Sequence, residues 1–339
     1  MTKVVVVVLN YKTPDLAVKA AQSAARAMMS LEGAIILVDN DSSDGSFELM
    51  KAGVAAARWP GHLTVQVLQS GHNGGFGAGN NYGIRAGRSI CPDAEFVYVL
   101  NPDAQVHDDG IVALVEHLKA NPRAAIAGSW LYDEAGKDVC SAFRLPGIAS
   151  EFEGAVRFGP VTRLLKKFVL PLHLPETSRP VGWIVGASML ARMDALSEIG
   201  LFDETFFLYF EETDLCLRAQ RAGYEVHFVR ESKVFHIGSV STGMGSWTRT
   251  PRYWFESRWH YFSKNYGRVY AIAATSMTVL GTLLRRARGW IERKPDTDSP
   301  RFLRDLLAHD FRALFRWSPS TAVQSNSDLP EAGLQISTE

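Results

Sequence analysis

Residues 96–103 read Phe-Val-Tyr-Val-Leu-Asn-Pro-Asp, an apolar run of strand type that ends in polar residues. Similar apolar runs precede it at Val4–Leu9, Ala34–Val38 and Leu63–Leu68, and each is followed by a helix-like segment. Strands that alternate with helices are typical of a mainly parallel sheet covered by helices. The sequence therefore predicts an α/β fold.

The segments around these strands complete the pattern. Helices are expected over Asp15–Met29, Ser46–Ala57, Ala78–Gly87 and, capped by Asp108 and Asp109, up to Ala120. The alternation weakens after Ala125 and resumes with a strand at Gly182–Ala191, a helix ending near Gly200, an acidic helix over 212–222 and a strand at Glu225–Val229. Residues 141–180 are rich in Pro, Gly and basic side chains, and we interpret them as a mobile lid.

The composition excludes several classes of protein. The chain has 339 residues with 36 basic and 36 acidic side chains, so no bulk charge indicates a nucleic-acid partner. Three widely spaced cysteines form neither a disulfide framework nor a zinc ligand set, which fits a reducing compartment. The first apolar run is too short for a signal peptide. We therefore expect a cytoplasmic protein.

The carboxyl region has a different pattern. Residues 247–266 interleave aromatic and basic side chains, and Val269–Leu284 is uncharged but shorter than the roughly 20 residues of a bilayer span. Arg301–Trp317 has apolar residues on one face and arginines beside the other. Two interpretations fit: a helix in the plane of a membrane surface, or a helix packed on the catalytic domain.

These observations predict three regions. The domain 1–246 has a nucleotide-binding half, 1–125, and an acceptor-facing half, 126–246. A helical extension covers 247–317. The polar tail 318–339 is expected to be disordered.

Polar side chains follow several of the predicted strands. Asp39 and Asp41 come after the second strand, Asn101 and Asp103 after the fourth, and His236 after a later apolar run. Open α/β sheets bind ligands at the carboxyl ends of their strands. Asp103 there could bind a divalent cation that bridges two phosphates, although an Asn-Pro-Asp turn explains the tripeptide equally simply. His236 could be a further ligand or a structural histidine.

The segment 73–81 is rich in glycine at the entry to a helix. Glycines let the backbone approach a phosphate or nucleoside, and a helix amino end favours anions. The residues of interest are Asn73, Gly74, Gly75 and Asn80. The segment matches neither the dinucleotide fingerprint nor the P-loop, so a nucleotide would be bound in another way.

Glu211, Glu212 and Asp214 place three carboxylates at the start of a helix, after the aromatic run 206–210. The helix dipole favours ionised acids there, whereas burial and like charges raise their pKa values. Helix capping explains one or two of these acids. An ionised carboxylate among them could take the proton from an attacking sugar hydroxyl.

Taken in order, these motifs resemble the family-two glycosyltransferases. The similar blocks are Val4–Tyr11, Val38–Gly45, Asn73–Asn81, Tyr98–Asp103, Gly186–Leu190 and Phe202–Arg218. Leu100–Asp103 and Phe207–Arg218 are similar to the bacterial rhamnosyltransferase-type members. The resemblance covers roughly residues 3–266 and implies a GT-A fold, with inverting transfer of a sugar from a nucleotide-diphospho-sugar.

The resemblance also implies roles for residues. Glu212 matches the catalytic base position, with Glu211 and Asp214 in support, and either glutamate could be the base. Asn10, Asp39 and Asn80 match nucleoside-contacting positions. Asp103 and His236 match the region that holds the diphosphate and a Mn²⁺ or Mg²⁺ ion. The family's Asp-x-Asp is Asn-Pro-Asp here, a form that the rhamnosyltransferase-like members share.

The leading hypothesis is transfer of L-rhamnose from dTDP-rhamnose to a glycan or lipid-linked acceptor in cell-surface polysaccharide synthesis, with a peripheral location on the inner face of the plasma membrane. Transfer of galactose or GlcNAc from a UDP-hexose keeps the same fold. A non-catalytic sugar-nucleotide-binding protein is the third alternative. A nucleotidyltransferase would need a basic, glycine-rich loop after the first strand, and residues 10–14 are not one.

Overall fold

The computed structural model describes residues 1–238, 247–296 and 298–315, and the tail expected at 318–339 lies outside these ranges. Strands and helices alternate in the amino-terminal half, as expected. Its elements are β1 (Lys3–Asn10), α1 (Pro14–Ala27), β2 (Glu32–Asp39), α2 (Ser46–Ala56), β3 (Leu63–Gln69), α3 (Gly75–Ile90) and β4 (Phe96–Leu100). Helix α3 begins inside the glycine-rich segment rather than at Ala78.

The next part of the chain completes the sheet and its cover. Its elements are β5 (Ala104–Val106), α4 (Gly110–Ala120), β6 (Ala124–Tyr132), β7 (Asp138–Val139), β8 (Ala142–Phe143), α5 (Ile148–Val156), α6 (Gly159–Leu164), β9 (Arg179–Val181), β10 (Trp183–Ile184), β11 (Ser188–Arg192), α7 (Met193–Ile199), α8 (Glu211–Arg221) and β12 (Glu225–His236). Asp109 occupies the N-cap position of α4, but its side chain makes no capping hydrogen bond.

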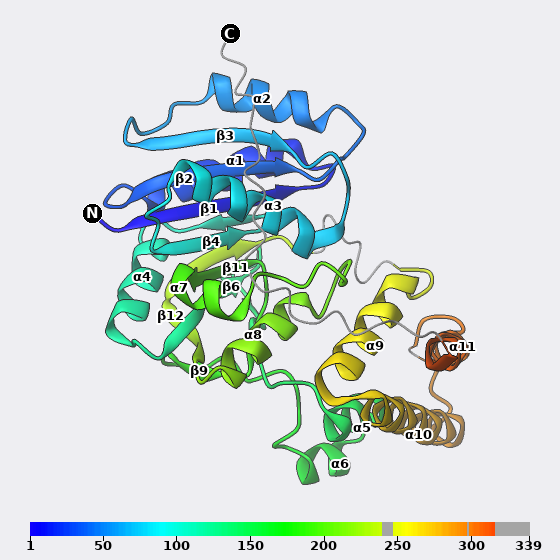
Figure 1. Ribbon diagram of the computed structural model, residues 1–339. Helices are drawn as coiled ribbons and strands as arrows, with labels where there is room; N and C mark the ends of the chain where they lie inside the picture. Colours follow the sequence, from blue (N-terminus) through cyan, green and yellow to red (C-terminus); the bar gives the residue numbers. More distant parts are fainter. Residues whose placement is uncertain (239–246, 297, 316–339) are drawn as a thin grey trace.

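The main sheet has the order β3-β2-β1-β4-β11-β6-β12-β5, with β7 beside β6 and β9 beside β12. Strands β3, β2, β1 and β4 are parallel, whereas β11 runs antiparallel between β4 and β6. Helices cover the sheet on both faces (Figure 1). The valines 4–8 of β1 are fully buried, which explains why this strand is a continuous apolar run. The predicted α/β fold is confirmed.

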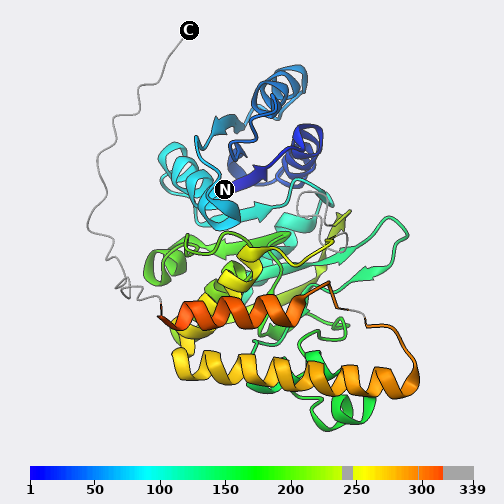
Figure 2. The same cartoon turned by 90° about the vertical axis from the view of Figure 1, so that its right-hand side faces the viewer.

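Three helices follow the sheet: α9 (Arg252–Tyr266), α10 (Arg268–Glu292) and α11 (Phe302–Phe315). Figure 2 shows α10 and α11 side by side at the lower end of the molecule. Arg258 of α9 is 1% exposed, and its Nη2 lies 2.7 Å from Oε2 of Glu151 on α5 and 3.1 Å from Oγ1 of Thr278 on α10. The extension is therefore packed on the rest of the chain.

The expectation of a mobile lid over 141–180 does not fit α5, which is packed on α10. A Cβ at Gly281 of α10 would lie 2.8 Å from the Phe152 carbonyl oxygen, so the two helices are in backbone contact. Arg285 Nε of α10 also donates to the Ala155 carbonyl at 3.1 Å. Among the described helices none is long and apolar enough to cross a bilayer.

Candidate active site

Strand register brings the polar residues to one edge of the sheet. Asn10, the last residue of β1, is level with Asp39, the last residue of β2. Asn10 Nδ2 donates to Asp39 Oδ1 at 2.9 Å, and Ser42 Oγ donates to the same oxygen at 2.5 Å. All three side chains are buried. Asp41 lies in the same turn with φ of 55° and is partly exposed.

Asn40 joins this turn to the glycine-rich segment. Its Nδ2 donates to Asn73 Oδ1 at 3.0 Å and to the Gly75 carbonyl at 3.1 Å. Asn40 is not among the site residues predicted from the sequence, although it lies next to Asp39 within the polar run that follows the second strand.

The glycines of this segment serve close packing. Gly75 has φ of 89°, and a Cβ on it would lie 1.9 Å from the Phe207 carbonyl oxygen. Gly74 N donates to the His72 carbonyl, Gly75 N to Asn73 Oδ1 and Phe76 N to the Phe207 carbonyl. These three N–H groups have protein acceptors in the structure, and the expected approach of Gly74 and Gly75 to a phosphate or nucleoside stays a prediction. The segment also holds the residues that precede α8.

Two asparagines of α3 have different environments. Asn81 Nδ2 donates to the Phe202 carbonyl at 2.8 Å and Phe202 N donates back to Asn81 Oδ1 at 3.1 Å, so Asn81 is a structural link. Asn80 is fully buried, and its Nδ2 donates to the Phe76 carbonyl. Asn80 Oδ1 has no hydrogen-bond partner among the described residues. A buried acceptor without a donor is a place where a ligand N–H or O–H would gain a hydrogen bond.

Strands β5 and β12 bring Asp103 and His236 together. His236 is level with Ala104 across the antiparallel pair, and its Nε2 lies 3.3 Å from Oδ1 of Asp103. The side chains are 14% and 5% exposed. Within the described ranges no three acidic, His or Cys side chains form a metal cluster. The Asp103 carboxylate and the His236 imidazole could together hold a divalent cation, which would supply positive charge for a diphosphate.

The helix of the acidic cluster begins at Glu211 after two residues with left-handed backbone. Tyr209 and Phe210 each have φ of 70°, a conformation that costs free energy for residues other than glycine. Glu211 is 2% exposed, whereas Glu212 is partly buried. Oε2 of each glutamate has no hydrogen-bond partner in the described part of the chain. Surrounding structure must therefore hold this strained turn and its two acids in place.

Burial sets the protonation of both glutamates. It raises the pKa of Glu211 well above its ordinary value, and the neighbouring Glu212 raises it further. Burial raises the pKa of Glu212 to about 7, although the backbone N–H groups of Glu212 and Gly186 act in the opposite direction. Ala187 follows Gly186, and its backbone carbonyl accepts a hydrogen bond from Asn101 N at 3.0 Å. One short loop therefore contacts both Glu212 and the turn that contains Asp103.

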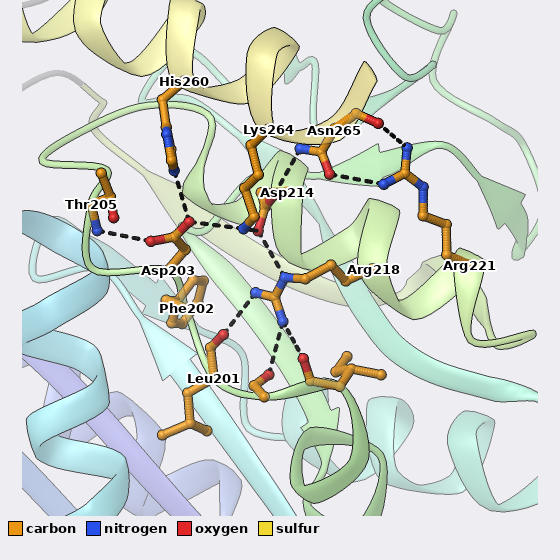
Figure 3. A network of polar contacts seen from close by, with 12 residues as sticks. Leu201, Phe202, Asp203, Thr205, Asp214, Arg218, Arg221, His260, Lys264 and Asn265 are labelled. Carbon is orange, nitrogen blue, oxygen red and sulfur yellow. Dashed lines mark hydrogen bonds and ion pairs between the residues drawn. The ribbon is translucent and has the colours of Figure 1, made fainter. Parts of the chain in front are cut away.

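Asp214 has a different environment from the two glutamates (Figure 3). Its fully buried carboxylate accepts from Arg218 Nε at 2.8 Å, from Lys264 Nζ at 2.9 Å and from Asn265 Nδ2 at 2.9 Å. Burial raises the pKa of Asp214, but Arg218 and Lys264 outweigh it and hold the pKa below its ordinary value. Asp214 fixes α8 to α9.

The same cations hold the loop before α8. Lys264 Nζ lies 2.8 Å from Oδ2 of Asp203, and His260 Nε2 lies 2.9 Å from the same oxygen. Arg218 donates to the carbonyls of Ile199, Gly200 and Leu201. Figure 3 shows that these side chains converge from α8, α9 and the loop 199–205. Asp203, His260 and Lys264 are not among the residues predicted from the sequence, because no local sequence pattern marks side chains that meet only in the fold.

Comparison with known proteins identifies the family. The model of the family described as Glycosyl transferase family group 2 matches residues 96–292. The model of Glycosyl transferase family 2 matches residues 4–172. The chain belongs to glycosyltransferase family 2. The glycosyltransferase is 32% identical over 217 residues to N-acetylglucosaminyl-diphospho-decaprenol L-rhamnosyltransferase of Mycobacterium tuberculosis, with 62% of this chain and 68% of the relative covered.

A second relative agrees with this assignment, and a solved structure shares the fold. The glycosyltransferase is 26% identical over 166 residues to the rhamnosyltransferase WbbL of Escherichia coli, with 48% of this chain and 60% of that protein covered. The solved mannosyltransferase PcManGT of Pyrobaculum calidifontis, in complex with GDP-Man and Mn²⁺, has a TM-score of 0.51. It is 13% identical, with 92% of this chain and 85% of that chain covered, so it supports the GT-A fold.

Proposed function

We propose that the glycosyltransferase transfers L-rhamnose from dTDP-rhamnose to a glycan or lipid-linked acceptor in cell-surface polysaccharide synthesis. Two relatives are named as rhamnosyltransferases, and one of these names specifies a diphospho-decaprenol acceptor. The observation that carries the proposal is the acid pair Glu211–Glu212, joined through residues 186–187 to the Asp103 turn. This arrangement supports a proton acceptor beside the expected diphosphate site.

In the proposed reaction the acceptor hydroxyl attacks the anomeric carbon of the donor. Glu212 takes the hydroxyl proton, the new C–O bond forms, and the nucleoside diphosphate leaves with its bonding electrons from the opposite face. The anomeric configuration is inverted. The raised pKa of Glu212 suits a general base near neutral pH, and Glu211 is the alternative base.

The remaining residues are assigned to the donor. Asn10, Asp39 and Asp41 line the nucleoside end of the sheet edge, while Asn80 offers its buried oxygen. Further donor contacts are assigned to Asn73 and Asn101. Asp103 and His236 would hold a Mn²⁺ or Mg²⁺ ion, which when bound neutralises charge on the diphosphate leaving group.

The reaction is proposed to occur at the cytoplasmic face of the membrane, because the acceptor of the Mycobacterium relative carries a lipid. The carboxyl-terminal helices support this location through the apolar side chains that they expose. A lipid-linked acceptor presents its sugar at the bilayer surface, so a peripheral enzyme would reach it without crossing the membrane.

The test is a donor panel of dTDP-rhamnose, UDP-galactose, UDP-GlcNAc and GDP-mannose, each with Mn²⁺, Mg²⁺ or EDTA. Binding is measured by calorimetry and hydrolysis by release of the nucleoside diphosphate. Selective use of dTDP-rhamnose is expected. Preference for a UDP-sugar would replace the donor but keep the reaction class. No binding of any of the four would favour a donor outside the panel or a non-catalytic protein.

A further inference from the structure

Helix α10 exposes a continuous apolar stripe. Its buried positions, among them Ala274 and Gly281, face α5 and α9, whereas the opposite side carries large apolar side chains at helical spacing. The exposed fractions are Val269 82%, Ile272 42%, Leu280 44%, Leu283 52%, Leu284 48%, Trp290 85% and Ile291 75%. The stripe runs nearly the full length of this helix, and contiguous apolar surface of this kind marks an interaction site.

Two other helices carry the same kind of surface. On α11, Leu307 is 49% exposed, Phe311 63% and Phe315 75%, at successive turns of the helix. At the end of α6 and just beyond it, Leu164 is 82% exposed and Phe168 49%. Figures 1 and 2 place α6, α10 and α11 at the end of the molecule opposite to α2. The three helices that expose these apolar side chains therefore lie at one end of the molecule.

The charge on these three elements is mainly basic. Residues 157–168 contain no Asp or Glu, and the one acid of α10 is its last residue, Glu292, which pairs with Arg288 and Lys294. The two acids of α11 are turned inward: Asp305 pairs with Arg249, and Asp310 is 4% exposed beside Arg258. Exposed basic side chains flank the apolar surface at Arg157, Arg163, Lys166, Lys167, Arg301, Arg304 and Arg312. The surface is therefore apolar and mainly basic, and its exposed carboxylate, Glu292, is paired with basic side chains.

We propose that α6, α10 and α11 form a docking face for an anionic lipid bilayer. Apolar side chains from helices that lie along the surface enter the headgroup region, while arginines and lysines contact anionic headgroups. A second copy of this chain fits less well, because it would bring two basic faces together. The inference rests on the proposed function in that a lipid-linked acceptor requires an enzyme at the bilayer.

The face is tested by flotation of the full chain with phosphatidylcholine vesicles, with and without phosphatidylglycerol. The wild type is expected to float with the anionic vesicles and to release at high salt. The double variant Leu283→Glu/Phe311→Glu is expected to bind at least about tenfold more weakly. Leu49→Glu is the matched control, because Leu49 on α2 is 56% exposed at the opposite end of the molecule.

A second variant tests the charge separately. Arg163→Ala/Lys166→Ala/Lys167→Ala on and after α6 should lower the preference for anionic over neutral vesicles several-fold, without exposing new apolar surface. Flotation of the Leu283→Glu/Phe311→Glu protein equal to wild type would overturn the proposal, as would a wild type that stays at the bottom with both vesicles. A dimeric wild type that becomes monomeric in this variant, with no vesicle binding, would assign the face to self-association instead.

The flotation assay needs neither donor nor acceptor, so its failure is separate from that of the proposed function. If dTDP-rhamnose is not used but the wild type still floats, the donor is wrong and the docking face stands. If the protein glycosylates a water-soluble acceptor but does not float with vesicles, the proposed transfer reaction is supported and the docking face is wrong.

Discussion

Nζ of Lys264 lies 2.9 Å from Oδ2 of Asp214, an ion pair that joins α9 to the helix of the acidic cluster. Asp214 is fully buried, and Lys264 also pairs with Asp203 in the loop before that helix. The extension therefore belongs to the candidate active site, although the sequence suggests a separate region. Its first helix holds the strained turn at Tyr209 and Phe210 from which Glu211 and Glu212 project.

Replacing Lys264 by Met should destabilise the protein by about 1–3 kcal/mol, because it leaves buried carboxylate oxygens of Asp214 without one cation. Turnover should fall more than donor affinity, since the base is displaced while the sheet edge is intact. Urea unfolding and steady-state kinetics measure the two effects. Lys264→Arg should restore much of the stability and of the turnover. Arg252→Met removes an exposed ion pair on the same helix and should change stability and turnover little. Equal effects of both Met variants would contradict the positioning role.

Gly75→Ala should lower stability by more than about 2 kcal/mol, because a Cβ would lie 1.9 Å from the Phe207 carbonyl and φ is 89°. The shift should also move the residues before α8 and reduce transfer. Gly154→Ala in α5 is the matched control, since nothing lies within 4 Å of its Cβ position. That change is expected to be neutral or slightly stabilising in thermal unfolding. A stable, active Gly75→Ala protein would show that the two segments need not touch.

The raised pKa of Glu212 predicts a specific dependence of stability on pH. Between its ordinary value of 4.5 and about 7 the native state keeps a proton that the unfolded state has lost. The free energy of unfolding therefore falls as pH rises through this window, by about 2–3 kcal/mol for this group, and then levels off. Glu212→Gln removes the effect, so its stability relative to wild type should increase from pH 5 to pH 8 in urea unfolding. An unchanged difference would show that the carboxyl has an ordinary pKa.

Asp103→Asn should remove any enhancement of nucleoside diphosphate binding by Mn²⁺ and leave the affinity in EDTA within about twofold. The reason is that a neutral amide is a poorer ligand for a hard divalent cation than a carboxylate. Calorimetric titration with the diphosphate, with and without Mn²⁺, measures this. Asp108→Asn, an exposed acid in the chain segment after β5, is the control. Full metal enhancement in the Asp103 variant would remove Asp103 from the proposed site.

Local pattern was sufficient to predict the first half of the fold. The buried runs at Val4–Val8 and Phe96–Leu100 are strands covered on both faces, and such strands are apolar throughout. Strand ends then place Asn10, Asp39 and Asp103 at one edge of the sheet, because parallel strands share their carboxyl ends.

The rest depends on contacts between distant segments. Two partners of Asp214, Lys264 and Asn265, lie 50 and 51 residues further along the chain, so the sequence groups Asp214 with its neighbours Glu211 and Glu212. Gly75 is a similar case: a glycine run predicts close approach, but only the fold shows that the approaching group is the Phe207 backbone. The carboxyl-terminal helices pack on the rest of the chain through their inner faces, as one of the two interpretations predicts, and the membrane-surface interpretation stays a prediction.

The most direct test of the account compares wild type, Glu212→Gln and Glu211→Gln in donor binding and in transfer to a soluble acceptor. If Glu212 is the base, Glu212→Gln should bind the donor within about twofold of wild type while transfer falls about 10²–10⁴-fold. Glu211→Gln should retain most of the transfer. Unchanged transfer by Glu212→Gln would contradict the assignment of the base, and loss in Glu211→Gln alone would move that role to Glu211.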